Sequence, residues 1–453
     1  MYQINSKEEK KQFYELVATL VLPMALQNLI NVGVTSADVI MLGKVGETAL
    51  SASSLAGQVY FIMTLVFFGL TSGAAVLTAQ YWGKKDIRSI EKILGISMRI
   101  ALCVAAGFMI VVLLFPYQIM HIFTSEQDVI QGGVEYLRIT VFSYLFAATT
   151  LVYLNIMRSI ERVIISTIVY MISLMVNVAL NAVFIFGLLG FPAMGIKGAA
   201  LATLIARITE FVIVIFYSKK MNHTVRFRIK DFFVKDKLLM KDFLVYAVPV
   251  ILNEMFWGLG VSMLTAVIGH LGSPAVAANS VAQVVKQLAM VVTFGLSNAT
   301  AIMIGKVIGE GREDLAKLYG KRFVKLSLAL GVVGAGVILT ISPIVRANLT
   351  LSEQAQGYLR AMMFVMSYFV IAQAYNTTMV VGVFRAGGDT RFGLILDLVS
   401  LWGFAIFLGA IAAFVFKAPV IVVYIILLSD EVIKLPATTW RYRTYKWVKN
   451  VTR

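Results

Sequence analysis

Residues 23–45 read PMALQNLINVGVTSADVIMLGKV, and residues 249–271 read PVILNEMFWGLGVSMLTAVIGHL. The second stretch follows the first at an offset of 226 positions (249 − 23 = 226), and the two copies stay in step without a gap through positions 86 and 312. Identical residues at this offset include Pro23 and Pro249, Gly43 and Gly269, Ala52 and Ala278, and Ser54 and Ser280. A register kept over this length indicates two homologous halves.

The repeat continues further along the chain, with one extra residue in the second copy. Arg158 corresponds to Arg385 and Pro192 to Pro419, an offset of 227 in both cases (385 − 158 = 227; 419 − 192 = 227). In membrane proteins, homologous halves are typical of transporters that bind their substrate between the repeats. The duplication therefore favours a transporter.

Composition places the chain in the membrane class. Apolar residues make up 59% and charged residues 14% of the sequence, and the mean hydropathy is +0.84. A bilayer is crossed by a helix of about 20 apolar residues. Candidate spans, six in each half, cover 16–43, 51–80, 93–115, 134–157, 163–189, 196–218, 243–269, 278–308, 322–345, 356–384, 392–416 and 419–440. The first lacks a small-residue cleavage site, so we interpret it as a retained helix and not as a signal peptide.

The placement of charge predicts the topology. The net charge is +16, and Lys and Arg collect in alternate loops, most densely in the connection between the halves. The basic residues of that connection are Lys219, Lys220, Arg226, Arg228, Lys230, Lys235, Lys237 and Lys241. The positive-inside rule puts the connection and both termini in the cytoplasm. Contact with anionic lipid explains this charge, so we expect the bilayer and no nucleic acid as a partner.

These observations predict an all-α membrane protein with twelve transmembrane helices in two pseudo-symmetric six-helix bundles. We divide it into an N-terminal six-helix lobe at 1–218, a basic cytoplasmic linker at 219–242 and a C-terminal six-helix lobe at 243–453. We expect a multi-pass monomer in the cytoplasmic (inner) membrane.

Asp38 is a carboxylate inside the first predicted span. A carboxylate in a spanning helix costs several kcal/mol, so such residues carry most of the functional signal. The repeat counterpart of Asp38 is Leu264, which indicates that folding of the repeat does not require the acid. The alternative is an ionised group that snorkels to the surface, which a short Asp side chain does poorly.

Asn177 and Asn181 stand four residues apart in the fifth predicted helix, hence on one face. Amides in a spanning helix can simply hold helices together. Facing Asp38, with a hydroxyl from Thr203 of the sixth helix, they would instead form an oxygen-rich nest for sodium or for a shuttled proton. We predict these four residues as the cation-coupling residues, with Asp38, Asn177 and Asn181 as metal ligands if the ion is Na⁺.

Glu254 lies in the seventh predicted span, and its repeat counterpart is Asn28. An amide precedes each of them, at Gln27 and Asn253, as a central cavity lined from both sides would require. Lys286 of the eighth helix could instead hold Glu254 in an ion pair. Aromatic side chains would accept lipophilic cations in such a cavity. The predicted substrate-cavity residues are Glu254, Gln27, Asn28, Asn253, Trp257, Lys286 and Tyr375.

The remaining charges within the spans are interpreted as structural. Arg207 and Glu210, three residues apart on the sixth helix, are expected to pair with each other. The other members of this group are Asp397, Asp430, Glu431 and Lys434. They lie near the cytoplasmic ends of their helices or can pair locally.

No pattern of an enzyme is present in the sequence. The three histidines form no His-Glu-x-x-His pair for zinc, and no phosphate-binding Gly-x-x-x-x-Gly-Lys-Ser/Thr motif occurs. We therefore expect no enzymatic activity and no cofactor. An ion gradient, in Na⁺ or H⁺, would then supply the energy, and the buried acids would couple it to transport.

The chain resembles the multidrug and toxic compound extrusion (MATE) family of antiporters over nearly its whole length. The resemblance rests on the two six-helix halves and on Pro23 with DVIMLG at 38–43, GKVIGEG at 305–311, Asn177 and Asn181 before IFG at 185–187, and RAGGDT at 385–390. It implies a V-shaped pair of bundles that exports organic cations in exchange for sodium or protons.

The resemblance also implies roles for single residues. The cation site of the family's N-terminal lobe matches Asp38, Asn177, Asn181 and Thr203, and the seventh-helix Glu of the NorM-like branch matches Glu254. The family's tenth-helix Asp has no counterpart, because its position falls on Ala374. Without this Asp, a complete cation site in the C-terminal lobe is not expected, and Asp38 is favoured as the coupling residue.

We therefore predict a cation-coupled multidrug efflux antiporter that exports small organic, mainly cationic compounds by alternating access. A lipid-linked precursor flippase of the same superfamily is an alternative and would be expected to have a strongly basic cavity, for which Lys286 is the main candidate. A non-transporting receptor or scaffold would leave the buried acids unexplained.

Overall fold

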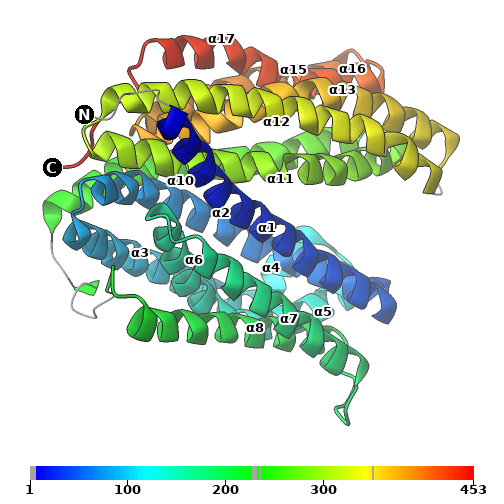
Figure 1. Cartoon of the computed structure of the whole chain (residues 1–453). Helices are drawn as coiled ribbons and strands as arrows, with labels where there is room; N and C mark the ends of the chain where they lie inside the picture. The colour runs from blue at the N-terminus through cyan, green and yellow to red at the C-terminus, as the bar shows by residue number, and fades with distance from the viewer. Residues whose placement is uncertain (1–6, 227–231, 234–235, 349–350) are drawn as a thin grey trace. The chain divides into compact units, whose positions relative to one another are not determined.

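The computed structural model describes residues 7–226, 232–233, 236–348 and 351–453 (Figure 1). Arg228, Lys230 and Lys235 of the predicted linker lie outside these ranges. Within them the chain is almost entirely helical. The first half contains α1 (Lys7–Val45), α2 (Glu47–Gly83), α3 (Ile87–Leu114), α4 (Pro116–Phe123), α5 (Gln127–Thr140), α6 (Ser143–Ser159), α7 (Ile164–Phe186), α8 (Ile196–Phe216) and the π-helical η1 (Tyr217–Met221).

The second half repeats this order with more irregular helices. It contains α10 (Lys237–Gly269), α11 (Ser273–Gly309), α12 (Glu313–Asn348), α13 (Glu353–Thr377), η2 (Thr378–Phe384), α14 (Thr390–Asp397), η3 (Leu398–Ile406), α15 (Phe407–Ala410), η4 (Ile411–Val415), α16 (Val420–Leu428) and α17 (Asp430–Arg443). Several predicted spans are thus continuous runs of α- and π-helix.

Ten helical runs among the described residues are long and apolar enough to cross a membrane, and the bent pair α5 and α6 makes an eleventh. The predicted span 134–157 falls on two helices, α5 and α6, which meet at 56°. Side chains explain the bend: Thr140 donates to the carbonyl of Tyr136 at 3.0 Å and Ser143 to that of Thr140 at 2.5 Å. Such bonds compete with the helical ladder. The predicted twelfth span, 419–440, is formed by α16 and α17, which break at Ser429.

The described residues group into two compact units. One comprises 7–25, 75–85 and the described residues of 248–453, and the other comprises 26–74 and the described residues of 86–247. We call them the C-terminal unit and the N-terminal unit. Helices α1 and α10 each contain a proline, Pro23 and Pro249, within two residues of a boundary between units. The predicted division at 218 and 243 stays a prediction.

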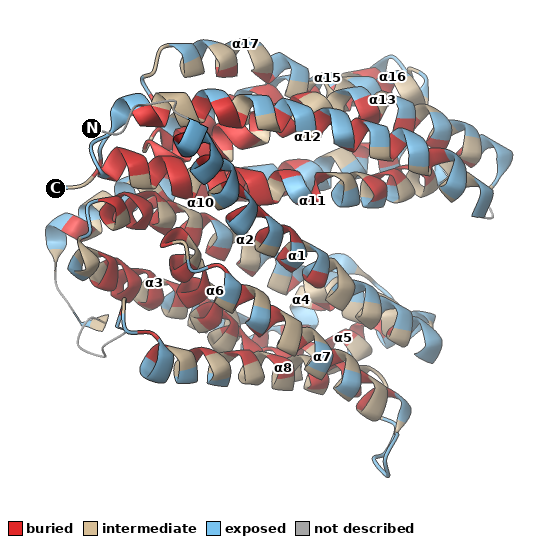
Figure 2. Cartoon of the chain, in the orientation of Figure 1, coloured by how far each residue is buried: buried red, intermediate tan, exposed pale blue. Residues whose placement is uncertain are grey.

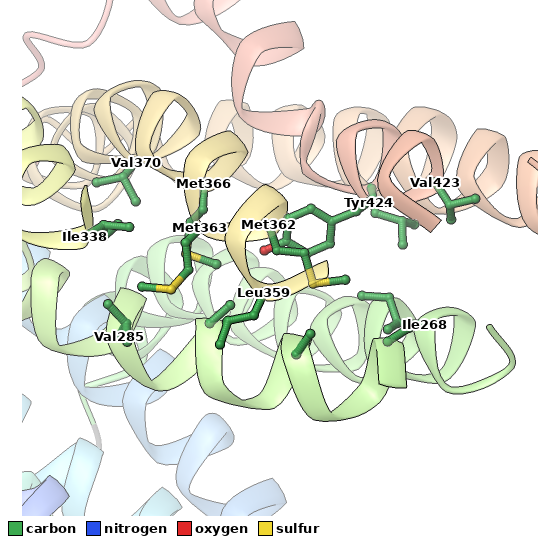
Figure 3. Close-up of a cluster of buried hydrophobic side chains, with 14 of the residues drawn as sticks. Ile268, Val285, Ile338, Leu359, Met362, Met363, Met366, Val370, Val423 and Tyr424 are labelled. Atoms are coloured by element: carbon green, nitrogen blue, oxygen red, sulfur yellow. The ribbon is translucent and has the colours of Figure 1, made fainter. Parts of the chain in front are cut away.

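The core of the C-terminal unit is formed by side chains of α10, α11, α12, α13, η4 and α16. Buried aliphatic, thioether and aromatic side chains fill it, among them Met362, Met363 and Met366 of α13 and Val423 and Tyr424 of α16 (Figure 3). The helices are buried on their inner faces and exposed on their outer faces (Figure 2). Exposed apolar faces are what a lipid environment requires of a helical bundle.

The ends of α2 and α11 approach each other so closely that a side chain would not fit. A Cβ atom on Gly83 would lie 1.9 Å from the carbonyl oxygen of Lys306, and one on Gly309 would lie 1.9 Å from that of Gln80. Gly83 corresponds to Gly309, and Gln80 to Lys306, at the repeat offset of 226 (309 − 83 = 226; 306 − 80 = 226). This reciprocal contact is what a local two-fold relation between the repeats produces.

The N-terminal part of the linker docks on the N-terminal unit. The backbone N–H of Arg226 donates to Glu91 Oε1 of α3 at 3.0 Å, and Lys92 pairs with Asp236 at 3.0 Å. A hydrogen bond from the backbone N–H of Leu239, followed by the ammonium of Lys92, holds the pKa of Asp236 below its usual range. Arg226 and Asp236 of the linker are therefore both held against α3.

Candidate functional site

Asp38 of α1 lies against α7 in the N-terminal unit. Asn181 Nδ2 donates a hydrogen bond to Asp38 Oδ1 and a second one to Asn177 Oδ1, the latter at 3.2 Å. Asn177 and Asn181 are 2% and 0% exposed, whereas Asp38 is half-buried. The structure thus brings together the three residues that the sequence predicted as a cation nest.

The second amide atom of Asn181 is unpaired. Its Oδ1 is buried and accepts no hydrogen bond within the described part of the chain. A buried amide oxygen without a donor costs free energy, about 1–3 kcal/mol. Carboxylate and amide oxygens are ligands that hard cations prefer. The oxygen atoms of Asp38, Asn177 and Asn181 therefore fit as ligands of a small cation, and Asn181 Oδ1 is available to bind it.

Thr203 of α8 takes part through a tyrosine that sequence reasoning missed. Its side chain hydrogen-bonds the hydroxyl of Tyr136 from α5, and Tyr136 interacts electrostatically with Asp38. Tyr136 also packs on a small core of Leu42, Ile185 and Ala199. No spacing in the sequence distinguishes it, because its interactions are with Thr203 of α8 and Asp38 of α1, which are far from it along the chain.

A charged pair lies on α8 near this site. Arg207 Nη1 lies 2.7 Å from Glu210 Oε1, which confirms the predicted local pairing. The guanidinium of Arg207 also sits over the ring of Tyr60, 5.6 Å from its centroid. Arg207 interacts electrostatically with Asp38 as well, so it adds positive charge to the surroundings of that carboxylate.

The two repeats use the same contact between an arginine and an amide. In the N-terminal unit Arg158 Nη1 donates to Gln27 Oε1 at 3.2 Å, and in the C-terminal unit Arg385 Nη2 donates to Asn253 Oδ1 at 3.0 Å. Gln27 also donates to Ser166, Thr167 and the carbonyl of Val163. Both amides, predicted to line a substrate cavity, are buried and hydrogen-bonded inside their own units.

Glu254 is paired with an arginine. Arg385 Nη2 lies 2.6 Å from Glu254 Oε1, and both side chains are buried. The ion-pair alternative named Lys286 as the partner, and this was the wrong residue. Arg385 looked like a loop charge in the sequence, yet it follows η2 directly and points back into the bundle. Its identity with Arg158 across the repeats was the available signal.

A buried network continues from this pair through the C-terminal unit. Asn253 Nδ2 donates to Asp397 Oδ2 at 2.7 Å, and Lys434 Nζ lies 2.9 Å from Asp397 Oδ1. Lys434 also contacts Asp430 at 2.9 Å and Glu431 at 3.8 Å. Local pairing of these residues is confirmed. The extent of the network, across α10, α14 and α17, was not predicted.

The other predicted cavity residues have mixed surroundings. Trp257 is 37% exposed, and Asn28 and Lys286 are half-buried. Tyr375 is buried, and its hydroxyl lies 3.2 Å from that of Thr439. Their contact with a substrate stays a prediction. Among the described residues no group of three or more His, Cys, Asp or Glu is arranged to hold a metal ion.

Comparison with known proteins gives a consistent family. The sequence model of the MatE family matches residues 23–183 and 249–411. A probable multidrug resistance protein NorM of Bradyrhizobium diazoefficiens is 26% identical over 413 residues, which cover 88% of this chain and 87% of the relative. The probable multidrug resistance protein YoeA of Bacillus subtilis is 22% identical over 406 residues, covering 88% and 87%.

Solved structures share the fold. A crystal structure of MATE in the bent conformation superimposes with a TM-score of 0.85 at 18% identity, covering 96% of both chains. A MOP superfamily transporter from Pyrococcus furiosus, described as having a binding pocket of reverse polarity, gives a TM-score of 0.85 at 20% identity, covering 95% of this chain and 96% of the other. At these identities the likeness establishes the fold.

Proposed function

Because this chain belongs to the MatE family of membrane transporters, we propose that it is a cation-coupled multidrug efflux antiporter of the cytoplasmic membrane. It exports small organic, mainly cationic compounds by alternating access in exchange for Na⁺ or H⁺. The names of its relatives, probable multidrug resistance proteins, support the substrate class.

One observation carries the assignment of the coupling site. Asp38, on a membrane-spanning helix, accepts a hydrogen bond from Asn181, whose own buried Oδ1 lacks a donor among the described residues. The incoming cation neutralises the Asp38 carboxylate. If it is Na⁺, the amide oxygens of Asn177 and Asn181 supply further ligands. If it is H⁺, the carboxylate alone binds it.

Linkage explains how such a site drives export. A cation that favours the drug-releasing state must weaken drug binding by the same coupling free energy. The repeat counterpart Leu264 cannot bind a cation, so the exchange in this scheme depends on the N-terminal unit. Transport by a monomer is sufficient for the scheme.

The test is exchange in proteoliposomes that contain the purified protein. A fluorescent organic cation is loaded inside, and a Na⁺ gradient or a pH gradient is imposed separately. Export driven by one gradient and abolished by its collapse supports the proposal and identifies the ion. Gradient-independent movement of a lipid-linked probe, with no export of organic cations, would instead support the flippase alternative.

A further inference from the structure

The network around Lys434 holds more negative than positive charge. Three carboxylates, from Asp397, Asp430 and Glu431, surround its one ammonium group. Lys286 of α11 interacts with Asp430 and Glu431 electrostatically, at longer range than a contact ion pair. Even if Lys286 is counted, one carboxylate remains in excess. Uncompensated charge inside a membrane protein is costly, so the group is stabilised by one further positive charge.

Glu254 and Arg385 do not correct this imbalance. They form an ion pair at 2.6 Å and so add no net charge, and the amide of Asn253 hydrogen-bonds both Arg385 and Asp397. The extra positive charge must therefore be found at the α17 end of the network, where Asp430 and Glu431 are adjacent in sequence.

Asn376 of α13 provides an independent observation at this end. Its Nδ2 donates to the backbone carbonyl of Glu431 at 2.6 Å and to Glu431 Oε2 at 2.9 Å. A carbonyl cannot donate, so the first bond fixes which amide atom is nitrogen. Its Oδ1 is then a buried acceptor, on a residue that is 3% exposed, and no described residue donates to it.

We propose that Glu431 and Asn376 form an exchangeable proton site in the C-terminal unit. The proton is held on the Glu431 carboxylate and donated to Asn376 Oδ1. An ionised carboxylate only accepts hydrogen bonds, whereas a protonated one supplies the O–H donor that Oδ1 lacks. The acid and the amide then pair through two hydrogen bonds, with Nδ2 donating to Oε2 and the carboxyl O–H donating to Oδ1.

The geometry favours a proton over a metal cation at this place. Lys434 Nζ lies 2.9 Å from Asp430 Oδ2 and 3.8 Å from Glu431 Oε1, so a metal ion between these carboxylates would lie against an ammonium group. A proton needs no such space. On uptake it passes from water to the carboxylate, and on release it returns to water, while no other bond forms or breaks.

The role of this site in transport rests on the proposed antiport. Asp38 lies in the N-terminal unit and Glu431 in the C-terminal unit. With a titratable group in each unit, both units would respond to pH during one exchange cycle. The binding of the proton itself does not depend on that role and can be measured without substrate or gradient.

The test is infrared difference spectroscopy on the purified protein in detergent, stepped from alkaline to acidic pH. We expect the carbonyl stretching band of a protonated carboxylic acid to appear in the wild type and one component of it to be lost in Glu431→Gln. In Asn376→Leu this component should shift to higher frequency, because the O–H loses its acceptor. Glu353→Gln, at an exposed acid at the start of α13, is the matched control: it loses the contribution of its own carboxyl group and keeps the Glu431 component.

Melting temperatures establish that each variant is folded. If folded Glu431→Gln keeps every component of the band, the proposal is wrong. If Na⁺ at constant pH, and not acid, changes the signal of Glu431, the site binds a metal cation and the proposal of a proton is wrong. Asp38→Asn, which should lose exchange, must keep the Glu431 component, so failure of this inference and failure of the antiport are distinguishable.

Discussion

Gly83 and Gly309 occupy equivalent positions in the two repeats, and each lies against a backbone carbonyl in the other's helix. The two distances from an added Cβ to that carbonyl oxygen are the same, 1.9 Å. Backbone atoms cannot move aside as the end of a flexible side chain can. Because α2 and α11 meet here without side chains, the contact has no room for any other residue.

Replacement of either glycine by alanine should destabilise the protein. We expect Gly83→Ala and Gly309→Ala each to cost about 1–3 kcal/mol, as overpacking does, and to lower the melting temperature by similar amounts. Gly107→Ala is the control, because an added Cβ in α3 meets nothing within 4 Å and alanine favours the helix by about 1 kcal/mol. Equal melting temperatures for all three variants would refute the reciprocal contact.

The two arginines of the repeated contact should differ in their importance. Arg385→Met leaves Glu254 as an unpaired buried carboxylate and should cost about 3–5 kcal/mol. Arg158→Met removes a donor from two amide oxygens, of Gln27 and Asn155, and should cost about 1–3 kcal/mol. Thermal unfolding in detergent compares them. If Arg158→Met is the more damaging, the pairing of Glu254 is not what Arg385 contributes.

The start of α1 should be held by a buried ion pair. Glu9 accepts two hydrogen bonds from Arg322 of α12, at 2.8 and 2.6 Å, and both residues are 7% exposed. Breaking such a pair leaves a buried charge and costs about 3–5 kcal/mol, so Glu9→Gln should lower the melting temperature clearly. Glu8→Gln, at the exposed neighbouring position, should change it little. A large effect of added salt on the wild type would contradict burial of the pair.

Docking of the linker should weaken in acid. The lowered pKa of Asp236 means that its bond to Lys92 and to the N–H of Leu239 stabilises the docked state above the usual Asp pKa of about 3.9 and is lost as pH falls through the folded value. The pair is partly exposed to solvent, which screens it, so we expect about 0.2–1 kcal/mol. Amide hydrogen exchange near 236–239 should be up to about fivefold faster in Asp236→Asn at neutral pH. On acidification the exchange rates of the wild type and of Asp236→Asn should become equal. A difference in rate that grows as the pH falls would contradict the role of Asp236.

Much of the fold could be predicted from the sequence, because each signal was local and periodic. The repeat offset located equivalent helices, and hydropathy located the spans. The bend between α5 and α6 was missed because it depends on hydroxyls that bond to the preceding turn.

The candidate site was predictable in part for the same reason. Asp38, Asn177 and Asn181 stand out because polar groups in a spanning helix need a partner. Tyr136 does not, and the role of the amide Asn376 could not be assigned, because both depend on which helix packs beside them. Arg385 lies at the end of a span, where a basic residue ordinarily indicates topology, and its pairing with Glu254 is a tertiary contact.

The measurement that tests the central claim most directly is gradient-driven export by Asp38→Asn in proteoliposomes. The substitution nearly keeps the shape of the side chain but removes the charge that either cation needs. Asp128→Asn, at an exposed acid of α5, is the control. With both proteins folded and equally inserted, we predict that export driven by a Na⁺ or pH gradient falls to the level of empty vesicles in Asp38→Asn and is unchanged in Asp128→Asn. Wild-type export by Asp38→Asn would contradict the assignment of Asp38 as the coupling site.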